Sequence, residues 1–278
     1  MSSRREVEAV TENVTTPEID PSLPVIAVFG PNMTAELGSR AARLLGGAIN
    51  RLGGVLLTGG DLPTNGYPTC PPPVKDAAIY GADEAGTTEQ PATWVGVANT
   101  KQAAAAASRG PASVLLTPGW GHRRNLVEAC LCDAAIAVVA APETDHHGSS
   151  ISEGTASEAL FTLFLGRPLF VVGTNLGDVD LSPRALKELA IKRVQSTGSE
   201  KAIDKGIVAA YTWAEAADRQ PVTKSLPADE LSASHMVAEI LGLLRQRTQR
   251  ALPLDLVDEP GWNRYVENEL RASVRWAL

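Results

Sequence analysis

The chain has 278 residues, of which 44% are hydrophobic and 21% are charged. These proportions are typical of globular proteins and exclude a wholly disordered chain, and the length predicts one or two domains. The net charge of -7 argues against binding to a nucleic-acid polymer or to an anionic membrane. No apolar run is long enough to span a membrane, the N-terminal segment is polar, and three cysteines form no disulfide framework. We therefore expect a cytoplasmic protein.

Short apolar runs alternate with helical patterns, which indicates an α/β fold with a parallel sheet. Strands are predicted at residues 25–29, 55–60, 94–98, 113–117, 134–140, 168–172 and 207–211. Helices are predicted at residues 74–85, 124–131, 155–165, 182–195 and 213–218. A further helix is predicted to start at Thr34 as N-cap and to end at Gly53, with an apolar stripe of Leu37, Ala41, Leu44, Leu45, Ala48 and Leu52.

The same alternation divides the chain into three parts. Residues 1–23 lack periodicity and are predicted to be a flexible tail. Residues 24–221 are predicted to form a Rossmann-like open parallel sheet flanked by helices. The alternation ends near residue 222, so residues 222–278 are predicted to be a helical extension, with helices at 231–247 and 262–276.

Glycines follow two of the predicted strands. Gly30 and Asn32 follow the first strand, and Gly59 and Gly60 end the second. Ligands of open parallel sheets bind at the carboxyl ends of the strands, and glycine lets the backbone approach a ligand closely. We therefore interpret these positions as candidate nucleotide contacts.

The segment 154–158 follows a strand and a polar loop and opens a helix. Backbone N–H groups at a helix N-terminus favour an anion such as phosphate, so Gly154 and Thr155 are candidate phosphate-binding residues. The alternative is a capping box, in which Glu158 only returns to the N–H of Thr155.

Two arginines lie in a glycine-rich turn before another predicted helix. Arg123 and Arg124 could grip a phosphate through paired hydrogen bonds. The alternative is that both arginines are solvent-exposed residues at the start of a helix and bind no ligand. Positive charge in a first helical turn opposes the helix dipole, and a bound anion would account for it.

Two further groups have weaker chemical interpretations. His146 and His147 could bind a metal, but adjacent histidines point apart and no further ligand is suitably spaced, so no metal is expected. Cys130 and Cys132 form Cys-x-Cys and are predicted to be buried free thiols.

These segments together resemble the LOG-type proteins, once called lysine decarboxylase-like, within the Rossmann-like SLOG group. The resemblance covers residues 24–220 and follows the order VFG, LLTGG, HRRN and GTASE. His122–Asn125 resembles the family's H-E-R-K, with Arg124 at the arginine and Asn125 in place of the lysine. Residues 154–158 resemble the end of P-G-G-x-G-T-x-x-E, with Glu158 at the acid, whereas the P-G-G part is absent as a unit.

The resemblance implies hydrolysis of the N-glycosidic bond of a nucleoside 5′-monophosphate to free base and ribose 5-phosphate. Such a transition state is oxocarbenium-like, and the catalytic carboxylate expected to stabilise it or to orient water is Glu158. Arg124 would hold the phosphate or assist the departing base. Gly154 and Thr155 would bind phosphate, and the turn at Gly59 would approach the nucleotide.

Two other functions remain open at this point. One is a non-catalytic nucleotide-binding or molybdenum-cofactor carrier protein of the same fold, which the missing P-G-G segment favours. The other is a structural or regulatory subunit that uses residues 222–278 as an interface. We expect a small-molecule nucleotide as the binding partner, no cofactor, no contact with nucleic-acid polymers or membranes, and a homodimer or larger homo-oligomer, as the resemblance implies.

Overall fold

Buried apolar runs form the central strands of the protein. The structure is a computed structural model that describes residues 22–32, 34–59, 71–88, 92–99, 113–117, 122–139, 151–174, 176–196, 211–212, 215 and 219–245. The strands are β1 (Val25–Phe29), β2 (Val55–Gly59), β3 (Trp94–Asn99), β4 (Ser113–Thr117), β5 (Ala134–Val139), β6 (Leu169–Gly173) and β7 (Val222–Ser225). They form one sheet in the order β4-β3-β2-β1-β5-β6-β7, and every neighbouring pair is parallel.

The strand order has one switch point. From β1 the chain moves outward through β2 and β3 to β4, and it then returns to place β5 on the other side of β1. In sheets of this kind ligands bind in the crevice at the switch point, which here lies at the carboxyl ends of β1 and β5. The parallel sheet and its topology confirm the predicted Rossmann-like α/β fold.

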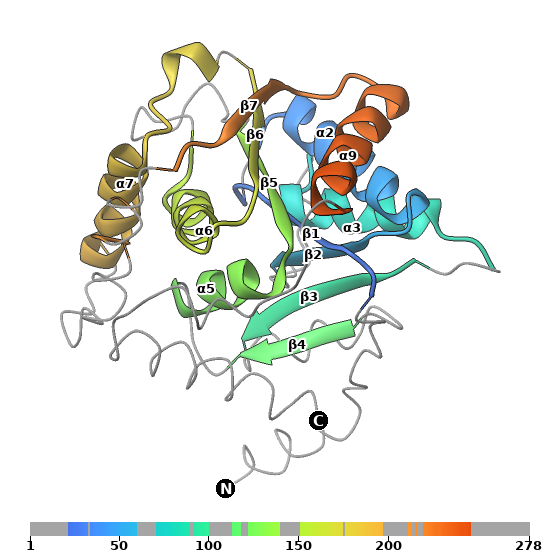
Figure 1. The fold of residues 1–278 in the computed structure, drawn as a ribbon, viewed down its shortest axis with the longest axis horizontal. Helices are drawn as coiled ribbons and strands as arrows, with labels where there is room; N and C mark the ends of the chain where they lie inside the picture. Colours follow the sequence, from blue (N-terminus) through green and yellow to red (C-terminus); the bar gives the residue numbers. More distant parts are fainter. Residues whose placement is uncertain are drawn as a thin grey trace, which may run out of the picture.

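Helices cover both faces of the sheet (Figure 1). One face packs against α2 (Glu36–Arg51), α3 (Val74–Ala85) and α9 (Glu230–Arg245), and the other against α5 (His122–Leu131), α6 (Glu153–Phe164) and α7 (Pro183–Ser196). The 3-10 turn η1 (Leu176–Asp178) follows β6. Successive side chains of a strand point to opposite faces. Ile26 and Val28 therefore pack in the layer that contains α2, α3 and α9, called the first layer below. Ala27 and Phe29 pack in the layer that contains α5, α6 and α7, called the second layer.

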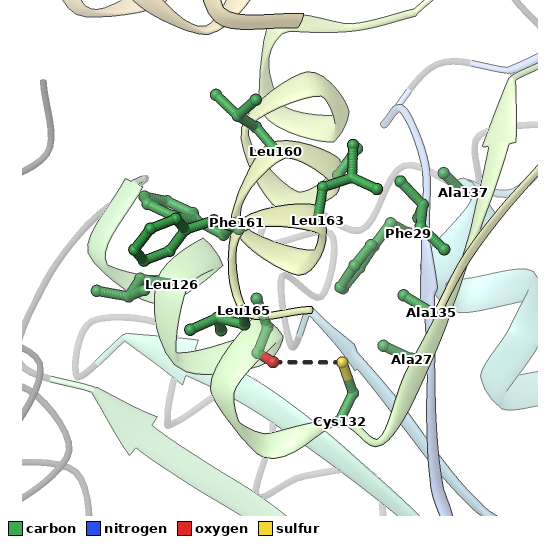
Figure 2. Packing of buried hydrophobic residues seen from close by; sticks show 14 of the residues in the cluster. Ala27, Phe29, Leu126, Cys132, Ala135, Ala137, Leu160, Phe161, Leu163 and Leu165 are labelled. Carbon is green, nitrogen blue, oxygen red and sulfur yellow. Dashed lines mark hydrogen bonds between the residues drawn. The ribbon is translucent and has the colours of Figure 1, made fainter. Parts of the chain in front are cut away.

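The second layer surrounds α6. Figure 2 shows Phe161 of α6 and Leu126 of α5 in one cluster with Phe29 of β1. Alanines at 27, 135 and 137 form the part of β1 and β5 that faces this layer, and their small side chains leave room for α6 to approach the sheet. This close packing fixes the start of α6 relative to the central strands.

The buried face of α2 differs from the prediction. Ala35, with no side-chain cap, precedes the helix in place of Thr34, and Leu37 and Leu52 are exposed. The reason is close contact with α3, because a Cβ on Gly46 would lie 1.9 Å from the carbonyl oxygen of Ala78. Small residues therefore define the buried stripe, in which the predicted Ala41, Leu45 and Ala48 do lie. The predicted helix end is confirmed by Gly53, whose φ is +77°.

The end of the chain corrects two predictions. Residues 207–210 and most of 213–218 lie outside the described residues, but Tyr211, placed at the end of a predicted strand, has helical backbone. The segment from 222 was expected to be only helical. Instead Val222–Ser225 forms β7 beside β6, and α9 buries Ala233, Val237 and Ile240 in the first layer. Residues 222–245 thus extend the α/β layers.

The tail at 1–21 and the segment 246–278 lie outside the described residues. Among the residues that are described, no helix is both long and apolar enough to cross a membrane.

Candidate functional site

The start of α5 brings two opposite charges to the carboxyl end of β2. Arg124 and Glu128 are one helical turn apart, and their Nε and Oε1 atoms are separated by 3.1 Å. The arginine side chain is 11% exposed and the glutamate side chain is fully buried. A buried carboxylate of this kind is strongly disfavoured unless a cation neutralises it, so Arg124 is held in a defined position.

Gly59 lies directly against this ion pair. A Cβ built on Gly59 would stand 3.4 Å from Oε1 of Glu128 and 3.6 Å from Nη2 of Arg124. These are ordinary van der Waals distances, and Gly59 has no positive φ. The surrounding protein therefore leaves space for a side chain at Gly59, and the fold itself does not require glycine there.

Gly30 has a different environment. A Cβ on Gly30 would lie 2.5 Å from a methyl carbon of Val74, at the start of α3. Close packing therefore accounts for this glycine without a ligand. Asn32, two residues further on, is exposed. Thr58 is buried, and its hydroxyl donates to the carbonyl oxygen of Val28 at 3.1 Å.

Asn125 joins α5 to the first turn of α6. Its Nδ2 donates to the carbonyl oxygen of Gly154 at 3.3 Å, and the residue is 1% exposed. Adjacent residues of a helix point about 100° apart. The start of α5 thus lies between β2, which Arg124 faces, and α6, which Asn125 faces. Two segments that the sequence analysis treated separately, at 122–125 and 154–158, are in contact.

Ser152 caps α6. Its hydroxyl accepts a hydrogen bond from the N–H of Thr155 at 3.2 Å and lies 2.8 Å from the Thr155 hydroxyl. The helix therefore starts at Glu153, two residues before the predicted start, and the alternative capping box of Thr155 with Glu158 is wrong. Glu158 lies within the helix, 7% exposed, on the same side as Gly154 one turn earlier.

Other predicted features fall into two groups. Gly60, the side chain of Arg123, and His146 and His147 lie outside the described residues. Cys130 and Cys132 are free and buried, as predicted. Burial raises the pKa of Cys130 to about 12 and raises the pKa of Cys132 as well, so both thiols are protonated at neutral pH. No cluster of three metal-ligating side chains occurs in the described part of the chain.

Sequence reasoning missed Glu128 and Ser152. Glu128 follows Arg124 at the spacing of a helical ion pair, which could have been noticed. Its complete burial could not, because Arg184 and Glu188 have the same spacing in α7 and are exposed. Ser152 is an ordinary N-cap residue, but Thr155 with Glu158 offered a competing cap in the same segment.

The topology defines the protein as a Rossmann-like α/β protein, and comparisons with known proteins find similar chains among solved structures. The molybdenum cofactor carrier protein of Chlamydomonas reinhardtii is 22% identical, over 79% of this chain and 99% of that one, with a TM-score of 0.43. The molybdenum cofactor binding protein of Rippkaea orientalis is 18% identical, over 80% and 99%, with a TM-score of 0.46. DNA processing protein A of Helicobacter pylori is 15% identical, over 66% and 75%, with a TM-score of 0.39. No family model and no curated protein matches the chain.

Proposed function

We propose that this protein binds a small phosphate-bearing molecule of the nucleotide class at the carboxyl edge of the sheet, between the end of β2 and the first turn of α6. The observation that carries the proposal is the position of Arg124, which is held beside Gly59 and is 11% exposed. The guanidinium group forms paired hydrogen bonds with phosphate oxygens, and it is the group suited to this ligand.

Two features of the surroundings support the same ligand. The N-terminus of α6 lies next to α5 through Asn125, and the dipole of a helix favours negative charge at this end. Glu153 in the first turn of α6 and the net charge of -7 oppose a highly charged polymer. A ligand with one phosphate group is therefore favoured over a nucleic acid.

We propose binding without turnover, as in a carrier or sensor, as the primary function. The groups on which this proposal depends are an arginine, a glycine and a helix terminus, and all three are binding groups. The molybdenum cofactor also carries a phosphate group on an organic ring system, so it belongs to the same chemical class of ligand and is a candidate cargo.

Hydrolysis of an N-glycosidic bond is the second candidate function. The observation that favours it is the position of Glu158, a buried carboxylate one turn from Gly154 that is not used for capping. A carboxylate beside a ribose would stabilise the positive charge of the transition state.

Calorimetric titration of the purified protein with AMP, GMP, CMP and the molybdenum cofactor tests the first proposal, with adenosine as the control without phosphate. We expect binding of at least one phosphorylated ligand and much weaker binding of adenosine. Arg124→Ala should weaken AMP binding far more than adenosine binding. Equal losses for AMP and adenosine would exclude the phosphate role of Arg124.

Chromatographic detection of free base after incubation with the same monophosphates tests the second proposal. If the protein is a hydrolase, base is released and Glu158→Gln abolishes release while AMP still binds. If AMP binds and no base appears, the protein is a binding protein. Hydrolysis that continues at the wild-type rate in Glu158→Gln would show that the catalytic assignment is wrong.

A further inference from the structure

The fully buried carboxylate of Glu128 has no role in the function proposed above. Its Oε1 lies 3.1 Å from Nε of Arg124 and close to the backbone of Gly59. A helix that connects two parallel strands runs antiparallel to those strands, as α5 does between β4 and β5. Arg124, at the start of α5, therefore lies nearer the carboxyl edge of the sheet, and Glu128 lies about 6 Å further from that edge. The carboxylate therefore contacts the arginine from the side of the core.

We propose that Glu128 is a positioning residue that orients the Arg124 guanidinium toward a phosphate group at the end of β2. The inference rests on the proposed binding function. Nε of Arg124 is buried beside the Glu128 carboxylate, 3.1 Å from Oε1. Nη2 is the atom that lies beside Gly59, at the edge where the ligand is expected. The ion pair thus keeps the guanidinium beside the end of β2.

The advantage to binding comes from order in the ligand-free protein. Arginine is a long side chain, and immobilising such a side chain on binding costs about 0.5–1.5 kcal/mol, which corresponds to about a twofold to twelvefold change in affinity. A fully buried carboxylate keeps the guanidinium in place before the ligand arrives. Gly59 supports the arrangement because it adds no side chain between the ion pair and the edge.

The chain contains a matched comparison. Arg184 and Glu188 in α7 have the same spacing, with an Nε to Oε1 distance of 3.4 Å, but their side chains are 78% and 64% exposed. An exposed pair of this kind holds its arginine weakly, because both groups exchange their contact for water. The burial of Glu128, and not the Arg-x-x-x-Glu spacing, is the feature that indicates positioning.

The test is a double-mutant cycle on binding of AMP and adenosine, using wild type, Glu128→Gln, Arg124→Gln and the double variant. Glutamine keeps the shape of the side chain and removes its charge. We expect Glu128→Gln to weaken AMP binding about twofold to twelvefold, to leave adenosine binding unchanged, and to have no further effect when Arg124 is already glutamine. Glu188→Gln is the control and should bind AMP like wild type.

Other outcomes separate the two proposals. If the wild type binds AMP and Glu128→Gln binds it equally well or more tightly, positioning by Glu128 is wrong and the proposed function stands. If Glu128→Gln weakens AMP and adenosine alike, or acts equally in both Arg124 backgrounds, its role is only structural. If the wild type binds no phosphorylated ligand, both proposals are wrong.

A second measurement follows the side-chain N–H of Arg124 directly. In ¹⁵N-labelled wild type, the Nε–H of Arg124, assigned through its loss in Arg124→Gln, should exchange slowly with solvent because Nε is buried beside the Glu128 carboxylate. Glu128→Asp, which keeps the charge on a shorter side chain, should retain part of this protection and part of the AMP affinity. Fast exchange of this signal in the wild type would contradict a fixed guanidinium.

Discussion

Replacing Gly59 and Gly30 separately by alanine distinguishes a glycine needed for ligand approach from one needed for packing. At Gly30 the new methyl group would lie 2.5 Å from a carbon of Val74, about 1 Å inside normal contact. Overpacking of this kind costs about 1–3 kcal/mol. At Gly59 the nearest atom would be 3.4 Å away, which is an ordinary contact.

The two variants should therefore differ in stability and in binding. Gly30→Ala should lower the free energy of unfolding by about 1–3 kcal/mol, and the melting temperature by about 2–12 °C. Gly59→Ala should change the free energy of unfolding by less than about 1 kcal/mol, because the new contact is ordinary and alanine also restricts the unfolded chain. If a ligand approaches the end of β2, the added methyl group should weaken AMP binding at least about tenfold.

Denaturant unfolding and calorimetric titration of both variants measure these quantities. Gly59→Ala should behave as a folded protein that has lost phosphate-dependent binding. If it is destabilised as much as Gly30→Ala, the packing argument is refuted. If it is stable and binds AMP as tightly as the wild type, then no ligand approaches Gly59, and the proposed site is misplaced.

Three further predictions concern the surroundings of the site. Ser152→Ala should lower the free energy of unfolding by about 1 kcal/mol, because the N–H of Thr155 loses its acceptor; denaturant unfolding measures this, and an unchanged midpoint would contradict the cap. Cys130, whose pKa burial raises to about 12, should stay unreactive toward a thiol reagent between pH 7 and pH 9 and react only when the protein unfolds; reaction of the native protein that rises with pH would contradict its burial. Deletion of residues 222–278 should prevent folding, because β7 and α9 belong to the sheet and its first layer; a soluble, cooperatively unfolding 1–221 fragment would show that these elements are dispensable.

Local sequence patterns were sufficient for most elements of the fold. Five consecutive apolar residues form β1, and the helix predicted at 74–85 has the bounds of α3. These patterns are local because a buried strand between two helical layers needs apolar side chains on both faces. The β7 strand has no such pattern. Val222–Ser225 is largely exposed, and it becomes a strand because the backbone of β6 offers an edge with which it pairs.

The sequence does not decide which of two residues caps α6 or which side of α2 is buried. Ser152 and Thr155 are both good N-cap residues, and the structure places the first at the cap and the second inside the helix. Leu37 in α2 and Leu52 at its C-cap fit the helical period but are exposed. The buried face follows the small residues because α3 contacts α2 at Gly46.

The candidate site shows the same division between local and tertiary information. The residue types at Gly59, Arg124 and Glu158, and their places at the ends of strands and starts of helices, followed from the sequence by itself, because turns and helix starts are local features. Only the tertiary structure placed Arg124 against Gly59, joined Asn125 to α6 and buried Glu128, because these contacts depend on the strand order that brings β2 and the two helices together. In the sequence Glu128 cannot be distinguished from a solvent-exposed glutamate, whereas in the folded protein it is buried and forms an ion pair with Arg124.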